Sequence, residues 1–353
     1  MKTAARLLTL LVLASACQTA TEPGPVPVLK QRFEGQFWVG AAVSLPVLAR
    51  RDSLVRTHFN SLTAENAMKW KSLHPEPDRY IWEVADSLVA YAHQHGFRLR
   101  GHTLNWYQQT PEWVTRDQEG QLHSADSLMA LMKEHIHTVV KRYKNDIYAW
   151  DVVNEAISDD DSLLFRPNDF YLIAGPTYIE NAFRMAHEAD PEALLFYNDY
   201  STADPKKRER ILELLQDLLN KGVPVHGMGM QGHWDLEQPS LQEIETSIDA
   251  YAALGLQVQI TELDINCYAY TEQEPQQAEQ PWNPTLDSLL AQRYDELFAL
   301  LERKADKLSA VTFWGVDDSK TWLSNFPVKR RRNYPLLFDS LARPKAAFYR
   351  VVD

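Results

Sequence analysis

The sequence predicts a single α/β domain folded as a (β/α)₈ TIM barrel. Three observations support this fold class: short apolar runs alternate with longer amphipathic stretches, the alternation occurs eight times, and polar residues follow the carboxyl ends of most of the runs. Apolar runs of this kind are typical of buried parallel strands, and the amphipathic stretches are typical of crossover helices in βαβ units. Eight such units favour a closed barrel over an open sheet.

The expected strands are short and rich in apolar residues, as strands buried on both faces should be. In chain order they are Phe37–Val43, His58–Ala64, Phe97–Leu104, Ile147–Glu155, Ala193–Tyr200, Val225–His233, Leu256–Glu262 and Ala310–Gly315. The stretches with helical spacing and a charged face are Ala85–His95, Ser127–Lys144, Thr177–Ala189, Pro205–Lys221, Leu241–Leu254 and Leu286–Lys304. No change in composition after residue 32 marks a second domain, so we assign residues 32–353 to one barrel.

The first residues have the pattern of an export signal. A basic start is followed by the short apolar run Leu7–Leu13 and by small residues that end at Cys17. The run is too short to span a membrane as a helix. Small residues before a cysteine resemble the bacterial lipoprotein signal, although Ala14 stands where that signal usually has Leu. We therefore expect residues 1–16 to be a signal peptide and Cys17 to be acylated; a plain secretory signal is the alternative.

The segment that follows, residues 17–31, is rich in Pro and Thr and lacks periodicity, which predicts an extended tether. The expected location is the bacterial cell envelope, with the membrane contacted only through the lipid. The second cysteine, Cys267, would be a lone buried thiol, so no internal disulfide framework is expected.

The charge of the chain narrows the classes of partner. The formal net charge is −12 at pH 7. Nucleic-acid binding requires a basic patch, so the acidic balance argues against nucleic acid and is compatible with a neutral glycan. The histidines are scattered and form no HExxH motif, and no Walker A or GxSxG motif occurs. We therefore expect no metal, no nucleotide cofactor and no serine nucleophile.

Two glutamates end expected strands of the barrel. Glu155 closes the fourth run and Glu262 closes the seventh. A carboxylate at the tip of a buried strand is poorly explained by packing, because a buried charge is costly unless it is paired. Barrels of this kind carry their chemistry at the carboxyl ends of the strands. Two carboxylates facing one cleft could serve a glycosidase as acid and base, or as acid and nucleophile.

The neighbouring residues predict different protonation states for the two carboxyls. His233 ends the preceding strand and Asp264 follows Glu262 by one alternation, so hydrogen bonds from the histidine could keep Glu262 ionised. Glu155 follows Asn154, whose amide could hold a sugar hydroxyl, and an apolar stretch beside it would raise its pKa. We assign Glu155 as the acid/base and Glu262 as the nucleophile.

Seven motifs at strand ends together resemble glycoside hydrolase family 10, the retaining endo-β-1,4-xylanases, over residues 32–353. They are TAENAMKW (63–70), RGHTLNW (100–106), WDVVNEAI (150–157), YNDY (197–200), QGH (231–233), TELDI (261–265) and WGVDD (314–318). The resemblance implies hydrolysis of internal bonds of xylan and xylo-oligosaccharides by a two-glutamate double displacement without a cofactor. It implies the same roles for Glu155 and Glu262. We also expect a monomer.

The resemblance further implies a set of substrate-binding residues. Asn154 would bind the sugar's 2-hydroxyl, and Gln231 and His233 would contact the sugar and Glu262. Trp314 and Trp322 would enclose that sugar, with Trp322 crowding its C5 position. The glycone side, which holds the sugars on the non-reducing side of the cleaved bond, would be lined by Glu65, Asn66, Lys69, His102, Trp106 and Gln109.

Some features depart from the family or leave alternatives open. Tyr107 stands where the family commonly has His, and a tyrosine can still donate a hydrogen bond there. The polar stretch 268–284 would form a loop on the distal aglycone side with an effect that the sequence does not predict. The run Lys329–Arg332 could contact acidic or arabinose decorations, or lie in a solvated loop. The alternative functions are the same chemistry on cellulose or mannan, and a glycan-binding lipoprotein without catalysis.

Overall fold

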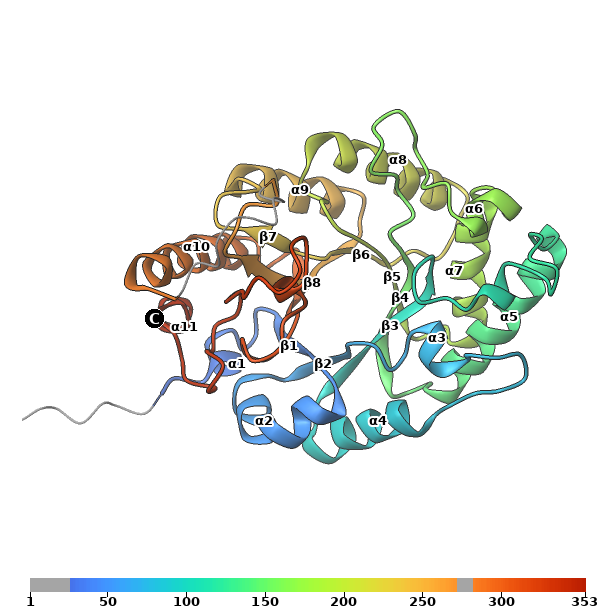
Figure 1. Cartoon of the computed structure of the whole chain (residues 1–353). Helices are drawn as coiled ribbons and strands as arrows, with labels where there is room; N and C mark the ends of the chain where they lie inside the picture. Colours follow the sequence, from blue (N-terminus) through green and yellow to red (C-terminus); the bar gives the residue numbers. More distant parts are fainter. Residues whose placement is uncertain (1–25, 272–281) are drawn as a thin grey trace, which may run out of the picture.

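The computed structural model describes residues 26–271 and 282–353; the expected signal peptide and Cys17 lie outside these ranges. Within them, nine parallel strands form one sheet in the order β6-β5-β4-β3-β2-β1-β9-β8-β7, and an additional pairing of β6 with β8 closes it. The short strand β7 (His233–Asp235) lies beside β8, outside the closed ring. The other eight strands form the barrel, with helices around it (Figure 1). The predicted (β/α)₈ fold is confirmed.

The barrel strands agree with the expected runs in number and order, and differ at some ends. They are β1 (Trp38–Val43), β2 (Ser61–Ala64), β3 (Arg98–Trp106), β4 (Ile147–Asn154), β5 (Leu194–Asp199), β6 (Gly227–Met230), β8 (Gln257–Asn266) and β9 (Leu308–Phe313). Strand β8 continues past Glu262, because β7 pairs with it from His233↔Asp264 to Asp235↔Asn266. Glu262 is therefore inside a strand, whereas Glu155 follows the last residue of β4.

The helices include each of the six expected segments. They are α1 (Leu29–Arg32), α2 (Leu45–His58), α3 (Trp70–Leu73), α4 (Glu83–His95), α5 (Ala125–Arg142), α6 (Asp169–Ala174), α7 (Thr177–Ala189), α8 (Pro205–Asn220), α9 (Leu241–Ala253), α10 (Pro284–Arg303) and α11 (Ala346–Val352). Helix α2 was not expected, and it includes His58, which we had placed in the second strand. Its regular spacing is interrupted at Arg51, whose backbone is not helical.

The packed body begins earlier than the sequence suggested. Leu29, in the segment expected as a tether, is fully buried, and its backbone N–H donates to His58 Nδ1 at 3.4 Å. Helix α1 therefore begins inside the expected tether, where Val26, Val28 and Leu29 stand among prolines and show no helical periodicity in the sequence.

The hexapeptide 227–232 has the GxGxxG spacing of a dinucleotide-binding turn, but it begins on barrel strand β6. A Cβ on Gly227 would lie 2.1 Å from the Phe196 ring, and one on Gly229 would lie 2.3 Å from Asn198 Oδ1. These glycines leave room for side chains of the neighbouring strand β5 inside the barrel. The pattern lacks the strand-to-helix turn that phosphate binding requires.

A buried ion pair links β3 and β4 inside the barrel. Arg100 donates from both terminal nitrogens to Asp151, and its Nε donates to Gln259 Oε1 at 2.9 Å. Arg100 is 1% exposed and Asp151 is fully buried. Asp151 also contacts His102 Nδ1 at 2.9 Å, so the pair positions one of the expected substrate-binding residues.

Replacing Arg100 by Met should lower the free energy of unfolding by about 3–5 kcal/mol, because Asp151 would be left charged and unpaired in the core. Urea denaturation measures the change. The double variant Arg100→Met/Asp151→Leu is the control, since removing both charges should recover part of the loss. A single variant as stable as the parent would show that the pair contributes little to folding.

Candidate active site

The backbones of adjacent strands fix both glutamates at the carboxyl end of the barrel. Glu155 has a φ of +60°, a left-handed conformation that a non-glycine residue adopts only when its surroundings impose it. Its N–H donates to the carbonyl of Asn198 at 2.9 Å. The N–H of Glu262 donates to the carbonyl of Gln231 at 2.7 Å. Both glutamates are buried, at 7% and 5% exposure.

Side-chain amides connect the two carboxyl groups. Asn154 Nδ2 donates to Glu155 Oε1 at 3.0 Å, and Gln231 Nε2 donates to the same oxygen at 2.9 Å. Asn198 Nδ2 donates to both Asn154 Oδ1 and Glu262 Oε1 at 2.8 Å. A chain of two asparagines therefore leads from one glutamate to the other. The structure brings together the residues that the sequence placed on separate strand ends.

The surroundings of Glu155 favour its neutral form. Burial raises the pKa of Glu155, and the negative charges of Asp199 and Glu262 raise it further. Hydrogen bonds from Gln231 and from Trp106, whose Nε1 lies 2.8 Å from Glu155 Oε2, offset only part of this effect. The predicted rise in the pKa of Glu155 agrees with the structure. The sequence attributed this rise to apolar surroundings alone, whereas the negative charge of Asp199 also contributes to it.

Glu262 is held ionised by positive neighbours. Burial alone would raise its pKa, but His102, His233 and Lys69 lower the pKa of Glu262 to about 2. His233 lies between two carboxylates, with Nε2 3.3 Å from Glu262 Oε2 and Nδ1 2.8 Å from Asp264 Oδ1. Although burial opposes it, Asp264 and Glu262 raise the pKa of His233 to about 10. The predicted Glu–His–Asp arrangement is present in the structure.

The expected glycone residues form a second group beside the glutamates. Lys69 Nζ donates to Asn66 Oδ1 at 2.9 Å and lies 4.9 Å from the centre of the Trp106 ring. Gln109 Nε2 donates to the same Asn66 oxygen at 3.4 Å. Glu65 pairs with Lys320 Nζ at 3.3 Å. Burial lowers the pKa of Lys69, and the charges of Glu262, Glu65 and Glu155 oppose that shift.

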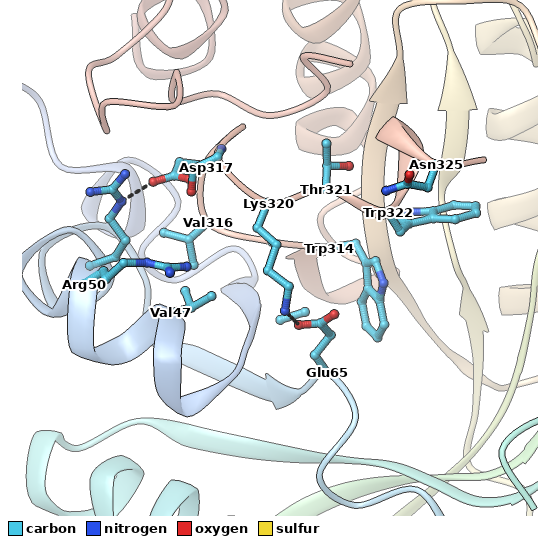
Figure 2. Close-up of a pocket in the computed structure, with 14 residues that line it drawn as sticks. Val47, Arg50, Glu65, Trp314, Val316, Asp317, Lys320, Thr321, Trp322 and Asn325 are labelled. Carbon is cyan, nitrogen blue, oxygen red and sulfur yellow. Dashed lines mark hydrogen bonds and ion pairs between the residues drawn. The ribbon is translucent and has the colours of Figure 1, made fainter. Parts of the chain in front are cut away.

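Both expected tryptophans lie close to His233. The His233 ring is 4.9 Å from Trp322 and 6.3 Å from Trp314, edge to face in both cases. Trp322 Nε1 donates to Asp264 Oδ2 at 2.8 Å, which fixes the ring against the same carboxylate that holds His233. Trp314 also lies 5.3 Å from His102. A cavity of about 250 Å³ opens next to this pair and to Glu65 (Figure 2).

Three further polar side chains lie at the site. Asn198 belongs to the YNDY motif but had no assigned role; it is fully buried and bridges Asn154 and Glu262. Lys320 had no assigned role. Tyr107, at the position where the family commonly has His, accepts a hydrogen bond from Gln108 at 2.8 Å and lies 4.9 Å below the Arg166 guanidinium. The register Asn154↔Asn198 would have indicated the first of these.

Across residues 26–271 and 282–353, no group of three or more His, Cys, Asp or Glu side chains could hold a metal ion. In the same ranges, no helix combines the length and apolar character needed to cross a bilayer.

Comparison with known proteins adds independent information. The family described as Glycosyl hydrolase family 10 matches residues 28–353. The chain is 44% identical over 329 residues to endo-1,4-beta-xylanase B of Paenibacillus barcinonensis, covering 93% of this chain and 98% of that protein. It is 46% identical to an endo-1,4-beta-xylanase of Geobacillus stearothermophilus, over 93% and 98% of the two chains.

Solved structures give the same result. The crystal structure of xylanase XynB from Paenibacillus barcinonensis, in complex with a conduramine derivative, superposes with a TM-score of 0.90 at 44% identity. The match covers 94% of this chain and 99% of that one. A mutant structure in complex with xylotriose superposes with a TM-score of 0.89 at 37% identity, covering 93% and 99% of the two chains.

Proposed function

The chain belongs to glycosyl hydrolase family 10, and we infer that it is a retaining endo-1,4-β-xylanase that hydrolyses internal β-1,4 bonds of xylan. The observation that carries this inference is the opposite tuning of two adjacent buried glutamates. Burial and the charge of Asp199 raise the pKa of Glu155, whereas His102, His233 and Lys69 lower that of Glu262 to about 2, so the surroundings favour a proton on Glu155 and a carboxylate on Glu262. This difference is what the double-displacement mechanism requires.

In the first step, the Glu262 carboxylate attacks the anomeric carbon while protonated Glu155 donates its proton to the leaving glycosidic oxygen. A covalent glycosyl-enzyme forms and the aglycone leaves. The ester has no charge, so the negative charge of Glu262 no longer raises the pKa of Glu155. Glu155 is then better suited to take a proton from water, which attacks the anomeric carbon and frees Glu262.

The remaining residues orient the sugar beside the cleaved bond. Asn154, already tied to Glu155 and Asn198, is placed to hold the 2-hydroxyl, where hydrogen bonds that strengthen in the transition state are most effective. Trp314 and Trp322 enclose the sugar from the β9 side, and Trp322 would exclude a CH₂OH group at C5. Lys69 and Asn66 bind the glycone with Glu65, His102, Trp106 and Gln109.

His233 helps to set the lower pH limit of activity, because it lowers the pKa of Glu262. Activity requires ionised Glu262, so kcat/KM falls as the pH falls through the pKa of Glu262, which is about 2 in the parent enzyme. Replacing His233 by Ala removes a positive neighbour and should move this acid limb upward by about 1–3 pH units. The basic limb, set by deprotonation of Glu155, should move less. Profiles of kcat/KM for a linear xylo-oligosaccharide give both limbs.

The control for that profile is His93→Ala, because His93 is a 60% exposed surface residue paired with Asp146. Its acid limb should match that of the parent. An unchanged acid limb in the His233 variant would show that His233 does not hold Glu262 in its ionised form.

Substrate class is tested by comparing hydrolysis of linear xylan, carboxymethyl-cellulose and mannan by the purified enzyme. We expect xylan to be cleaved with the highest kcat/KM, because xylose has no CH₂OH group at C5 that would clash with the Trp322 ring. Preferential cleavage of cellulose or mannan would assign the same chemistry to another β-1,4-glycan. Binding of xylan without cleavage would favour the non-catalytic glycan-binding alternative.

We also propose that the enzyme is a monomer anchored at the bacterial cell envelope through acylated Cys17. The supporting observation is the sequence pattern of a basic start, an apolar run and small residues ending at that cysteine. The full chain expressed in a bacterium should incorporate labelled palmitate and partition into a detergent phase. Cys17→Ala should do neither. Unchanged labelling of this variant would show that the lipid is attached to another residue.

A further inference from the structure

A cavity of about 250 Å³ lies beside the glycone residue Glu65, and neither catalytic glutamate lines it (Figure 2). Its inner end is lined by Glu65, Trp314 and Trp322, the residues expected to hold the sugar. Its outer end lies between helix α2 and the loop that follows β9, and the proposed mechanism gives that end no role. A group occupying the outer end would therefore be attached to a sugar bound at the inner end.

The cavity is more positive than the rest of the protein. Its charged lining residues are Arg50, Arg51 and Lys320 on the positive side and Glu65 and Asp317 on the negative side, a net charge of +1 (3 − 2). The whole chain has a formal net charge of −12. A cation in excess beside a binding cleft of an acidic protein points to an anionic ligand, since the local field attracts negative groups.

One of these cations is available to a ligand. Arg51 is used within the protein, because its Nε donates to Asp317 and its Nη2 donates to the carbonyl of Ser340 at 2.9 Å. Lys320 shares its charge with Glu65 at 3.3 Å, and its side chain is 55% exposed. Arg50, within the parts of the chain that the structure describes, has neither an ion pair nor a hydrogen bond from its side chain. Figure 2 shows it on α2, beside Val47 and Val316.

This combination suits a sugar that carries a carboxylate. A guanidinium matches a carboxylate with two parallel hydrogen bonds, and a nearby ammonium adds charge without fixing direction. Val47 and Val316 offer an apolar wall for the carbon face of a sugar ring. Xylan chains carry such groups as hexuronic acid substituents, so the ligand can be part of the same polymer that the catalytic site cleaves.

We propose that this cavity binds a hexuronic acid substituent on the glycone part of the xylan chain, with Arg50 holding its carboxylate and Lys320 contributing a second positive charge. The proposal rests on the proposed xylanase function, because the substituent reaches the cavity only from a xylan chain bound in the cleft. It assigns to α2 and the loop after β9 the selection of acidic over undecorated xylan.

The test compares the parent enzyme with Arg50→Gln on three substrates: a linear xylo-oligosaccharide, the same chain carrying one hexuronate, and its carboxyl-reduced form, which has a neutral sugar of similar size. Loss of one partly exposed charge pair should lower kcat/KM for the acidic substrate about fivefold, equivalent to about 1 kcal/mol. The values for the linear and the carboxyl-reduced substrates should stay within about twofold of the parent, because neither substrate offers a charge for Arg50 to pair with. Added salt should narrow the difference on the acidic substrate.

Arg330→Gln is the matched control. Arg330 is an exposed arginine in the 329–332 run and outside this cavity, so the variant makes the same change of net charge elsewhere. It should keep the parent's preference for the acidic substrate. If Arg330→Gln loses that preference and Arg50→Gln keeps it, the uronate is bound by the basic run and the proposal is wrong.

The remaining outcomes distinguish failure of the uronate proposal from failure of the xylanase function. Equal losses on the acidic and carboxyl-reduced substrates would mean that Arg50 contributes shape rather than charge, which contradicts the proposal. Cleavage of the linear substrate with no effect of Arg50→Gln on the acidic one would overturn the proposal and leave the xylanase function intact. Failure of the parent enzyme to cleave the linear substrate would overturn the function itself.

Discussion

Replacing Glu262 by Ala should lower kcat on xylan by a factor on the order of 10⁴–10⁶, because the variant loses the carboxylate that attacks the anomeric carbon. Glu262 is buried and accepts a hydrogen bond from Asn198 Nδ2 at 2.8 Å. Its neighbours lower its pKa to about 2, so it is a carboxylate at any pH at which the enzyme works. Binding uses other residues, so the variant should still be retarded by xylan in an affinity gel.

Azide distinguishes a lost nucleophile from general damage. In Glu262→Ala, azide can occupy the space of the missing carboxylate and attack an aryl β-xylobioside that has an activated leaving group. The product should be the α-glycosyl azide, because a single displacement inverts the anomeric centre. Turnover close to that of the parent would remove Glu262 as the nucleophile. Glu34→Ala, a change of an exposed glutamate, controls for the loss of one carboxylate and should be fully active.

Replacing Glu155 by Ala should lower kcat/KM on xylan by about 10²–10⁴, the range for loss of a general acid and base. The loss should be smaller for an aryl xyloside whose leaving group needs no proton. The basic limb of the pH profile should also disappear. In the parent, activity is lost as the pH rises through the raised pKa of Glu155, because the acid form is then no longer present.

Azide again reports the role of the residue. The Glu155 variant still forms the glycosyl-enzyme on Glu262, and azide attacks it from the face that Glu155 leaves open. The expected product is the β-glycosyl azide, the opposite anomer to that from Glu262→Ala. An equal loss on xylan and on the activated substrate, together with a retained basic limb, would contradict the acid/base role.

The barrel and the positions of the two glutamates could be predicted from the sequence because their signals are local. A strand followed by a polar residue is visible within ten or so letters, and the topology of a parallel barrel then brings such ends together. Helix α2 was missed for the opposite reason. Its pattern is interrupted at Arg51, and its burial depends on contacts with distant segments such as Leu29 and the C-terminal region around Phe348.

Long-range pairing explains the other differences. Strand β8 extends past Glu262 because β7 pairs with it, and β7 is too short to be recognised alone. Asn198 lies 44 residues from Asn154 and 64 from Glu262, so only the register of the sheet shows that it joins them. The effect of Asp199 on the pKa of Glu155 crosses from β5 to the end of β4 in the same way.

The most direct test of the central claim is proton NMR of xylohexaose hydrolysis by the body from about residue 22 onward, with the anomeric signals followed from the first turnovers. New reducing ends in shortened, internally cleaved products should appear first as the β-anomer and then mutarotate. That result follows only if a nucleophile on one face and an acid/base on the other act in succession. Early α-anomer would show inversion and would contradict the assignment of Glu262 as the nucleophile.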